Sequence, residues 1–318
     1  MKVAQKMESP IRPTWTTALR AKLRDSRLHD MVVQYRAIKR QVLRRSEGEA
    51  FLLRRYARVH DKSFNLGNPQ TFTEKLFWRM VTWNRGDMPP LFRQLTDKYA
   101  VRAHVARIVG ESCLIRLLWQ GDDPRAIPFD QLPAEYVIKP THASGQVIVV
   151  KGEADREKII RTALDWLASD YYWQAREYQY YGIKPSIVIE ECLTNEDGSP
   201  PLDYKLYCFN GRPELILVRN DTHDISPFFD TTWNLLDLSS EVGAARPWIP
   251  RPANLDEMLE LAGKLSDGIG FVRVDFYNVK GRVYFGELTF TPAGGILKFS
   301  PDKWDLSLGK EWNLALDS

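Results

Sequence analysis

Two apolar segments after residue 270 carry carboxylates and an arginine at a spacing that suits phosphate chemistry. Arg273 and Asp275 lie two residues apart in the first segment, and Glu287 lies in the second, after a turn at Lys280-Gly281. Because alternate residues of a strand share a face, a hairpin would place Glu287 beside Asp275, with Arg273 on the same face. Facing carboxylates suit Mg²⁺, and Arg273 would supply a fixed positive charge for a phosphoryl group or an oxyanion. A structural ion-pair cluster is the alternative interpretation.

A lysine and a loop of small residues form a second candidate site. Lys139 ends the apolar run Val137-Ile138, and Ser144-Gly145 lies in the loop before the next β-rich run. A lysine at a strand end, together with exposed N–H groups of a Ser-Gly turn, can neutralise and cradle phosphate oxygens. The segment is not a Walker loop, because no Gly-Lys-Ser/Thr sequence precedes a helix. An ordinary hairpin with an exposed lysine is the alternative.

Two further strand ends carry charged residues. Glu190 and Glu191 end the apolar run that begins at Ile187, where the backbone can face a purine edge while an acid accepts a ribose hydroxyl. Asp203 and Lys205 begin another strand, in which Lys205 could reach a phosphate and Asp203 could hold the lysine. Each pair is equally compatible with a plain strand terminus.

These residues have to be positioned by strands, and the sequence beyond residue 114 is rich in short β-type runs. Asn210-Gly211 and Lys280-Gly281 mark hairpin turns, and Thr71-Phe72-Thr73-Glu74 is a capping-box pattern that begins a helix. We expect helices at residues 71–83, 97–109, 155–169 and 255–266, and strands at 114–119, 136–139, 147–151, 187–192, 204–210, 214–220, 271–277 and 282–288. This mixture indicates α+β lobes.

Composition restricts the class of protein. The chain has 318 residues and 44% hydrophobic content, enough to fill the cores of two or three lobes. Its three cysteines are widely spaced, which favours neither a disulfide framework nor a zinc site. No apolar segment of about 18 residues follows the basic N-terminus, so we expect neither a signal peptide nor a membrane span, and a cytoplasmic location.

The positive charge is concentrated at the N-terminus. Residues 1–60 hold 15 Lys and Arg against 5 Asp and Glu, a local net charge of +10, so the remainder of the chain sums to −7. Apolar residues recur at helical intervals over residues 14–58. Such a basic helical extension can make peripheral contact with an anionic membrane surface, which would be the inner membrane face, or with an acidic glycan. A solvated helical face is the alternative, and without a recognised motif we expect no nucleic-acid partner.

Taken together in this order, the segments from about Asp97 to Gly295 resemble the ATP-grasp superfamily. The resemblance implies an α+β ATP-grasp fold that holds a nucleotide between two lobes, with ATP and Mg²⁺ as cofactors. It implies nucleotide-binding roles for Arg102, Lys139, Ser144, Gly145, Glu190, Glu191, Leu193 and Lys205. Within this set, Ser144-Gly145 is similar to the phosphate lid, and Glu190 to Leu193 to the hinge at the adenine and ribose.

The same resemblance assigns the chemistry of the last hairpin. It implies catalytic roles for Arg273 and Lys205, and metal contacts for Asp275, Glu287 and Thr289. Many ATP-grasp enzymes have Glu-x-Asn at the last metal contacts, whereas this chain has Glu287-Leu288-Thr289. A hydroxyl group or a water molecule must therefore replace the amide, and one Mg²⁺ is better supported than two.

Three phrases are more specifically similar to the TupA-like branch, which is associated with teichuronopeptide and other surface polysaccharides. They are Phe72–Leu76, Thr96–Tyr99 and Tyr284–Phe290. This resemblance implies an ADP-forming ligase that activates a carboxylate as an acyl phosphate and forms an amide with an amine. The substrates would be a uronic-acid-containing glycan or its precursor and an amino acid or peptide. An ATP-grasp-like kinase acting on a hydroxyl and a non-catalytic scaffold of a polysaccharide-assembly complex are the alternatives.

We expect four parts along the chain. Residues 1–60 form the basic helical extension and residues 61–133 the N-terminal lobe. Residues 134–194 form the central ATP-binding lobe with its lid, and residues 195–318 form the metal-binding and catalytic lobe.

Overall fold

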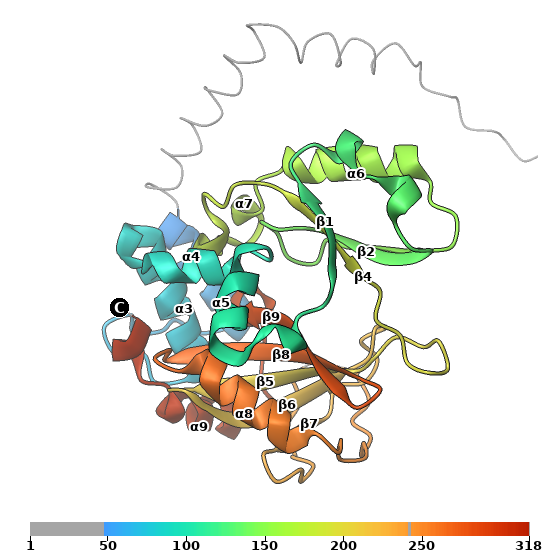
Figure 1. Cartoon of the computed structure of the whole chain (residues 1–318). Helices are drawn as coiled ribbons and strands as arrows, with labels where there is room; N and C mark the ends of the chain where they lie inside the picture. The colour runs from blue at the N-terminus through green and yellow to red at the C-terminus, as the bar shows by residue number, and fades with distance from the viewer. Residues whose placement is uncertain (1–47, 241–242, 318) are drawn as a thin grey trace, which may run out of the picture. The chain divides into compact units, whose positions relative to one another are not determined.

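The structure, a computed structural model, describes residues 48–240 and 243–317. Residues 49–318 form one compact unit, drawn in Figure 1. Most of the predicted basic extension, residues 1–47, lies outside the described residues. No helix within the described ranges is long and apolar enough to cross a membrane.

Helices and two antiparallel sheets make up the described unit. Residues 48–60 are helical. The later α-helices are α3 (Phe72–Thr82), α4 (Pro90–Thr96), α5 (Ala100–Val109), α6 (Arg156–Leu167), α7 (Tyr172–Ala175), α8 (Leu255–Ser266) and α9 (Lys303–Glu311). Short helical turns include the π-helical η1 (Trp83–Asp87), η5 (Tyr178–Tyr180), η6 (Pro292–Gly295) and η7 (Leu314–Asp317). The strands are β1 (Leu117–Gly121), β2 (Glu135–Pro140), β3 (Ile148–Lys151), β4 (Ile187–Glu191), β5 (Asp203–Phe209), β6 (Arg212–Arg219), β7 (Phe228–Asp230), β8 (Phe271–Val279) and β9 (Arg282–Thr289).

The larger sheet has the strand order β7-β6-β5-β8-β9. One of its faces is apolar along its length and is covered by α8 (Figure 1). Leu206 of β5 and Val274 of β8 lie in one buried cluster with Met258 and Ala262 of α8. Because the side chains of a strand alternate between its faces, this packing directs the residues at odd numbers of β5 and β8 to the opposite face.

The opposite face of the larger sheet is divided into an apolar and a polar half. At the apolar half, Phe209 and Phe271 pack against Phe72 of α3 and Trp312 at the end of α9, with 4.8 Å between the ring centroids of Phe72 and Phe271. The polar half continues along the same strands with Asp203, Lys205, Arg273, Asp275 and Tyr277, which occupy facing positions in β5 and β8. One face of the sheet therefore provides both a core and a charged surface.

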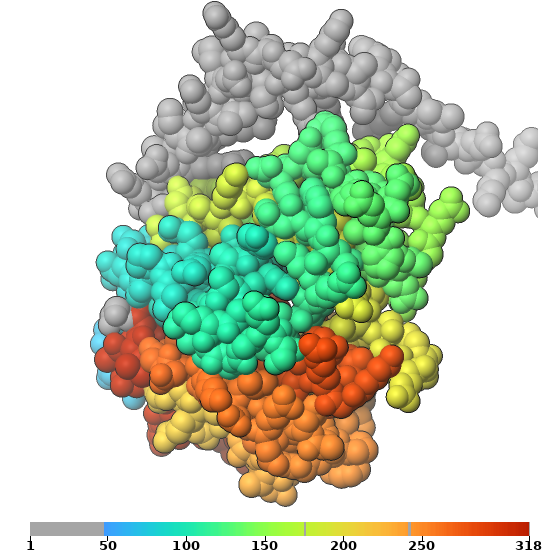
Figure 2. Space-filling model, in the orientation of Figure 1, coloured from blue at the N-terminus to red at the C-terminus, as the bar shows by residue number. Residues whose placement is uncertain are grey.

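The smaller sheet, with the order β1-β4-β2-β3, is covered on one face by α6. Ile138 and Ile189 pack there against Ile159 and Ala163. Alternation places Val137 and Lys139 on the other face of β2. Figure 2 shows the segment of α4 and α5, in cyan, lying against both the green segment above it and the orange segment below it on this side of the molecule.

The capping box predicted at residue 71 is present at the start of α3. The Thr71 hydroxyl accepts a hydrogen bond from the backbone N–H of Glu74 at 3.3 Å, and the Glu74 carboxylate accepts one from the backbone N–H of Thr71 at 3.1 Å. The helix at residues 48–60 packs on α3 through Leu52 and Tyr56, which join Phe77 in one buried cluster. This last part of the predicted extension therefore packs within the compact unit.

A fully buried arginine connects α3 to both strands of the last hairpin. Arg79 donates hydrogen bonds to the carbonyl oxygens of Phe290 and Phe271, both at 2.9 Å. Its guanidinium also forms an ion pair with Asp317 at 2.7 Å, and Trp312 donates to the other oxygen of that carboxylate at 2.6 Å. These bonds fix the beginning of β8 and the residue that follows β9.

Candidate active site

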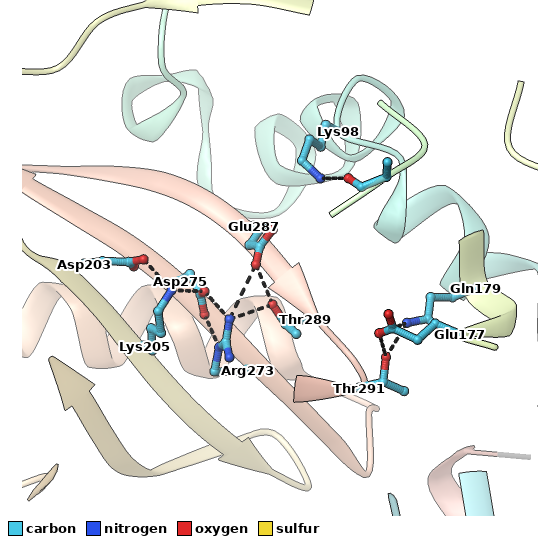
Figure 3. A network of polar contacts seen from close by, with 11 residues as sticks. Lys98, Glu177, Gln179, Asp203, Lys205, Arg273, Asp275, Glu287, Thr289 and Thr291 are labelled. Atoms are coloured by element: carbon cyan, nitrogen blue, oxygen red, sulfur yellow. Dashed lines mark hydrogen bonds and ion pairs between the residues drawn. The ribbon is translucent and has the colours of Figure 1, made fainter. Parts of the chain in front are cut away.

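The polar half of the larger sheet holds a compact group of charges (Figure 3). Asp275 lies opposite Glu287 in the β8–β9 pairing and opposite Lys205 in the β5–β8 pairing. Arg273 binds both oxygens of the Asp275 carboxylate, at 2.7 and 2.6 Å, and Lys205 Nζ donates to Oδ2 at 2.7 Å. The sequence prediction that Arg273, Asp275 and Glu287 share one face is confirmed by this register.

A β-bulge produces the opposition of the two carboxylates. The pairing shifts between Asp275 and Phe276, because Phe276 pairs with Phe285 whereas Asp275 pairs with Glu287. The extra residue is Gly286, at which a Cβ atom would lie 3.1 Å from the carbonyl oxygen of Asp275. A residue without a side chain therefore allows the close approach that turns Glu287 toward Asp275.

Glu287 is the more accessible carboxylate of the pair, with a side chain that is 34% exposed against 3% for Asp275. The Thr289 hydroxyl donates to Glu287 Oε1 at 2.8 Å, and Arg273 Nη2 lies 3.4 Å from the same oxygen. Burial raises the pKa of Glu287, but the nearby charges of Lys98, Arg273 and Lys205 outweigh it and lower the pKa to about 2. Glu287 is therefore an anion at neutral pH.

Lys205 is held between two carboxylates. Its Nζ donates to Asp203 as well as to Asp275, and it is largely buried. Burial lowers the pKa of Lys205, but the charges of Asp275 and Asp203 outweigh it and raise the pKa above its ordinary value. The lysine therefore remains a cation at the base of the site.

A second cluster of charges forms around Glu190 on β4. Its carboxylate accepts from Arg102 Nη1 at 2.9 Å and from Lys139 Nζ at 3.0 Å. Arg102 also donates to the carbonyl oxygen of Ile115 at 2.7 Å. The structure thus brings together three residues that the sequence resemblance assigned separately to nucleotide binding, and the Glu190 carboxylate is ion-paired.

Lys98 lies close to both clusters and was not among the predicted site residues. Its Nζ donates to the carbonyl oxygen of Ala143 at 2.7 Å, in the loop that contains Ser144-Gly145 (Figure 3). Burial lowers the pKa of Lys98, and the charges that act on it include Glu287 and Glu190. Asp97, which accepts from two backbone N–H groups at the start of α5, fixes the neighbouring backbone. The Asp97-Lys98 sequence was the signal that could have identified it.

A cavity of about 530 Å³ opens between the two sheets beside these clusters. Its size is in the range of small-molecule sites. Val137 and Val149 form an apolar wall, and Val149 is 53% exposed. At the opposite wall, Asp203 Oδ1 is buried without a hydrogen-bond partner. Of the predicted nucleotide residues, Lys139, Glu191 and Leu193 line this cavity, whereas Arg102, Ser144, Gly145, Glu190 and Lys205 are not among its lining residues.

A larger cavity of about 720 Å³ shares no lining residue with the first. It is lined mainly by polar and charged side chains, including Lys62, Lys298 and Asp305. Phe299 is the one large apolar side chain among the described residues that line it. A nucleotide base requires apolar contact area, which the smaller cavity provides, whereas the described lining of the larger cavity offers it at a single ring.

Two carboxylates suit a magnesium ion that takes its remaining ligands from water and phosphate, rather than a metal ion whose ligands all come from the protein. Among the described residues, no group of three or more His, Cys, Asp or Glu side chains is placed to hold a metal. Mg²⁺ binds in proteins through one or two carboxylates, with water and phosphate oxygens completing its shell. Asp275 and Glu287 meet this requirement, and a metal ion there would compete with Lys205 and Arg273 for the Asp275 oxygens.

The loop with Ser144 and Gly145 connects β2 to β3. Gly145 has a φ of 71°, which a glycine adopts without strain. Ser144 lies near Tyr171 and Tyr180, whose rings meet edge to face at 4.8 Å. Its placement against two aromatic residues was not expected from the sequence.

Comparison with known proteins identifies a family. Residues 74–313 match the family described as TupA-like ATPgrasp, which covers three quarters of the chain. The resemblance and the ATP-grasp fold predicted from the sequence are thereby confirmed. A comparison with curated proteins gave no match.

Solved structures that match part of the chain include several ligases. D-alanine-D-alanine ligase from Helicobacter pylori is 19% identical, with 69% of this chain and 61% of that chain covered and a TM-score of 0.45. The ligase of the same name from Bacillus anthracis, complexed with ATP, is 15% identical, with 68% and 62% covered and a TM-score of 0.41. L-amino acid ligase from Bacillus licheniformis is 13% identical, with 69% and 49% covered and a TM-score of 0.43. The chain thus spans about three fifths of the length of the first two and about half of the third.

Proposed function

We propose, because the chain belongs to the TupA-like ATP-grasp family, that it is an ADP-forming ligase that joins a carboxylate to an amine. The observation that carries this proposal is the pair of opposed carboxylates, Asp275 and Glu287, with Arg273 and Lys205 beside them. Phosphoryl transfer depends on positioning and charge stabilisation, and this group supplies both signs of charge on one rigid sheet.

ATP would occupy the 530 Å³ cavity. Val137 and Val149 offer apolar contact to adenine, and the strand end at Glu191 and Leu193 offers backbone groups to its edge. The unpartnered Asp203 Oδ1 is an acceptor suited to a ribose hydroxyl. Lys139, Arg102 and Lys205 supply positive charge for the phosphates, with Lys139 on the cavity wall.

Mg²⁺ bound by Asp275 and Glu287 would neutralise phosphate charge, with the Thr289 hydroxyl or a water molecule in place of the usual amide. The substrate carboxylate then attacks the γ-phosphate, which gives an acyl phosphate and ADP. Arg273 can stabilise the oxyanion when an amine attacks the acyl carbon. The Ser144-Gly145 loop would act as the lid that excludes water, because water would hydrolyse the acyl phosphate.

The proposed substrates follow from the branch of the family. We assign the carboxylate to a uronic acid in a surface glycan or its precursor, and the amine to an amino acid or peptide. The basic residues 1–60, with a net charge of +10, suit an acidic glycan or the anionic inner membrane face, which fits a cytoplasmic enzyme that acts at that surface. Residues 61–133, 134–194 and 195–318 would be the three lobes of the enzyme.

The test is a screen of ADP release over paired sugar acids and amino acids, with hydroxylamine added to trap an acyl phosphate as a hydroxamate. We expect one pair to require both substrates and to give hydroxamate when hydroxylamine replaces the amine. Asp275→Asn and Glu287→Gln should abolish both products, whereas Glu257→Gln on the exposed face of α8 should not. Phosphate transfer to a hydroxyl, with no amine requirement and no hydroxamate, would instead identify a kinase.

A further inference from the structure

A second polar cluster lies just beyond the carboxylate pair, where β9 ends against η5. It consists of Glu177, Gln179 and Thr291, whose residues are 5%, 2% and 1% exposed. The Thr291 hydroxyl donates to Glu177 Oε1, and Gln179 Nε2 donates to the Thr291 hydroxyl at 2.5 Å and to Glu177 Oε1 at 3.5 Å. Figure 3 shows this cluster beside the carboxylate group of the larger sheet.

The chain itself connects the cluster to the reacting groups. Glu287, Thr289 and Thr291 are alternate residues, and each contributes an oxygen to a polar contact. Glu177 is close enough to Glu287 for the two charges to affect one another. The cluster is therefore placed next to the point at which the acyl phosphate would form.

The cluster has more hydrogen-bond acceptors than donors. Gln179 Oε1 is buried and has no hydrogen-bond partner, although a buried acceptor without a partner is unfavourable. Beside it, the Glu177 carboxylate accepts from hydroxyl and amide donors. The complement to an orphaned carbonyl oxygen and a carboxylate is a group that carries several N–H donors and positive charge, which describes a primary ammonium.

We propose that Glu177 and Gln179 bind the amine substrate, and that the Glu177 carboxylate accepts its proton; this assignment rests on the ligase function proposed above. The Glu177 carboxylate takes one proton from the bound ammonium, which frees the lone pair of the nitrogen. The nitrogen then bonds to the acyl carbon, and the bond between that carbon and the phosphate oxygen breaks. Phosphate leaves with the electron pair and takes the second proton lost from nitrogen, so atoms and charges balance without a further reactant.

The electrostatics of Glu177 suit this role. Burial raises its pKa to about 7, although hydrogen bonds from Thr291 and Tyr171 and the charge of Arg55 oppose the increase. The charged or titratable groups that face it come from the helix at residues 48–60, from the segment around α7 and η5, and from β9: they are Arg55, Tyr171, Tyr180 and Glu287. A carboxyl group with this pKa can both receive and release a proton near neutral pH.

In this conformation the cluster is enclosed by residues that also reach the proposed lid. Tyr171 lies near both Glu177 and Ser144, and Tyr180 lies near Ser144. Movement of the Ser144-Gly145 loop would therefore change the enclosure of the amine position as well as that of the phosphates. An amine would enter before the loop closes and would then be shielded from water.

The experiment separates the two half-reactions in the full chain. Glu177→Gln keeps the shape of the side chain and removes its proton affinity. With a sugar acid that gives hydroxamate in the wild type, trapping by hydroxylamine, a weakly basic nucleophile that needs no proton acceptor, should stay within about threefold of wild type. Amide formation with the amino-acid amine should fall by roughly 10² to 10⁴, the range for loss of a general base.

A second variant tests binding of the amine alone. Gln179→Met removes the orphaned carbonyl oxygen and should raise KM for the amine by roughly threefold to tenfold, the effect of one hydrogen bond, with little change in kcat. Thermal unfolding of each variant verifies the fold. Glu257→Gln is the matched control and should leave both half-reactions unchanged.

The outcomes are distinct. Equal losses in hydroxamate and amide formation by folded Glu177→Gln would place the residue at the nucleotide, and no loss in either would remove it from the reaction. Both results would refute the amine site and leave the ligase proposal intact. A wild-type chain that forms no hydroxamate from any sugar acid or amino acid would refute the ligase function, and the amine site with it.

Discussion

Replacement of Lys139 by methionine tests whether this residue binds phosphate or only balances the charge of Glu190. The two side chains are 20% and 11% exposed, and their charged atoms are 3.0 Å apart. Methionine keeps the aliphatic stem, so the apolar wall of the cavity should persist. If Lys139 binds a phosphate, its removal should cost about 1.5 to 3 kcal/mol of binding, which is roughly a 10-fold to 150-fold increase in Kd.

If Lys139 only balances the charge of Glu190, the expected result is different. Of the two ion pairs that Glu190 forms in the structure, the Lys139→Met variant keeps only the one with Arg102. If Lys139 only neutralises Glu190, adding Glu190→Gln to Lys139→Met would restore nucleotide affinity, since no unbalanced carboxylate would remain near the phosphates. If Lys139 binds phosphate directly, the double variant should remain at least tenfold weaker than wild type.

The assay is isothermal titration of a non-hydrolysable ATP analogue with Mg²⁺, at fixed ionic strength because salt screens these charges. Lys151→Met is the matched control, since Lys151 lines the same cavity from an exposed position on β3. It should change Kd by less than about threefold, the effect of a screened surface charge. Wild-type affinity in a folded Lys139→Met variant, or full rescue by Glu190→Gln, would refute direct binding of phosphate by Lys139.

Three further outcomes are expected. Asp317→Ala leaves the buried Arg79 guanidinium without its carboxylate and should lower the free energy of unfolding by about 3 to 5 kcal/mol in urea titrations. Gly286→Val places a side chain against the Asp275 carbonyl and should reduce Mg²⁺-dependent ATP turnover roughly tenfold or more, with an unchanged circular dichroism spectrum. Folding raises the pKa of Glu177 from 4.5 to about 7. Between pH 4.5 and about pH 7, the folded chain therefore binds more protons at this residue than the unfolded chain does. Stability should therefore fall as pH rises through this window, by up to about 3 kcal/mol, and Glu177→Gln should remove that dependence in unfolding measured at pH values on either side of it.

Local rules explain which parts of the site could be predicted from the sequence. Strand alternation and the Lys280-Gly281 turn predicted that Arg273, Asp275 and Glu287 would share a face, and the register confirms this. The detail that the rules did not supply is the bulge at Gly286. If Gly286 paired regularly, it would lie opposite Asp275, and Glu287 would pair with Val274, because each step away from the turn advances both strands by one residue.

Contacts between distant segments could not be predicted by the same rules. Arg102 and Glu190 are 88 residues apart, and Glu177 and Thr291 are 114 residues apart. No local period encodes such pairs, because the packing of the lobes brings them together. A sequence pattern indicates charged residues at strand ends, but it does not indicate which of them will bind one another.

The missed helices have a related cause. α9 contains Gly309, which lowers helix propensity, and was not predicted. In the folded chain a Cβ atom at this position would lie 2.2 Å from the carbonyl oxygen of Gln70, so the glycine permits close contact between α9 and the start of α3. The short helix α4, of seven residues, was not predicted either. It begins with Pro90 at its first turn, which is a favourable helix start.

The bond between Arg79 and Asp317 also has a consequence for the synthesis of the chain. The two residues are 238 positions apart, and a ribosome that adds 5 to 20 residues per second needs roughly 12 to 48 s to cover that distance. During this interval the guanidinium cannot be buried with its carboxylate, although α3 and the helix before it have already been made. The carbonyl groups of Phe271 and Phe290 then become available before the carboxylate that completes the cluster. The hairpin that carries Asp275 and Glu287 therefore reaches its anchored position only after residue 317 has been translated.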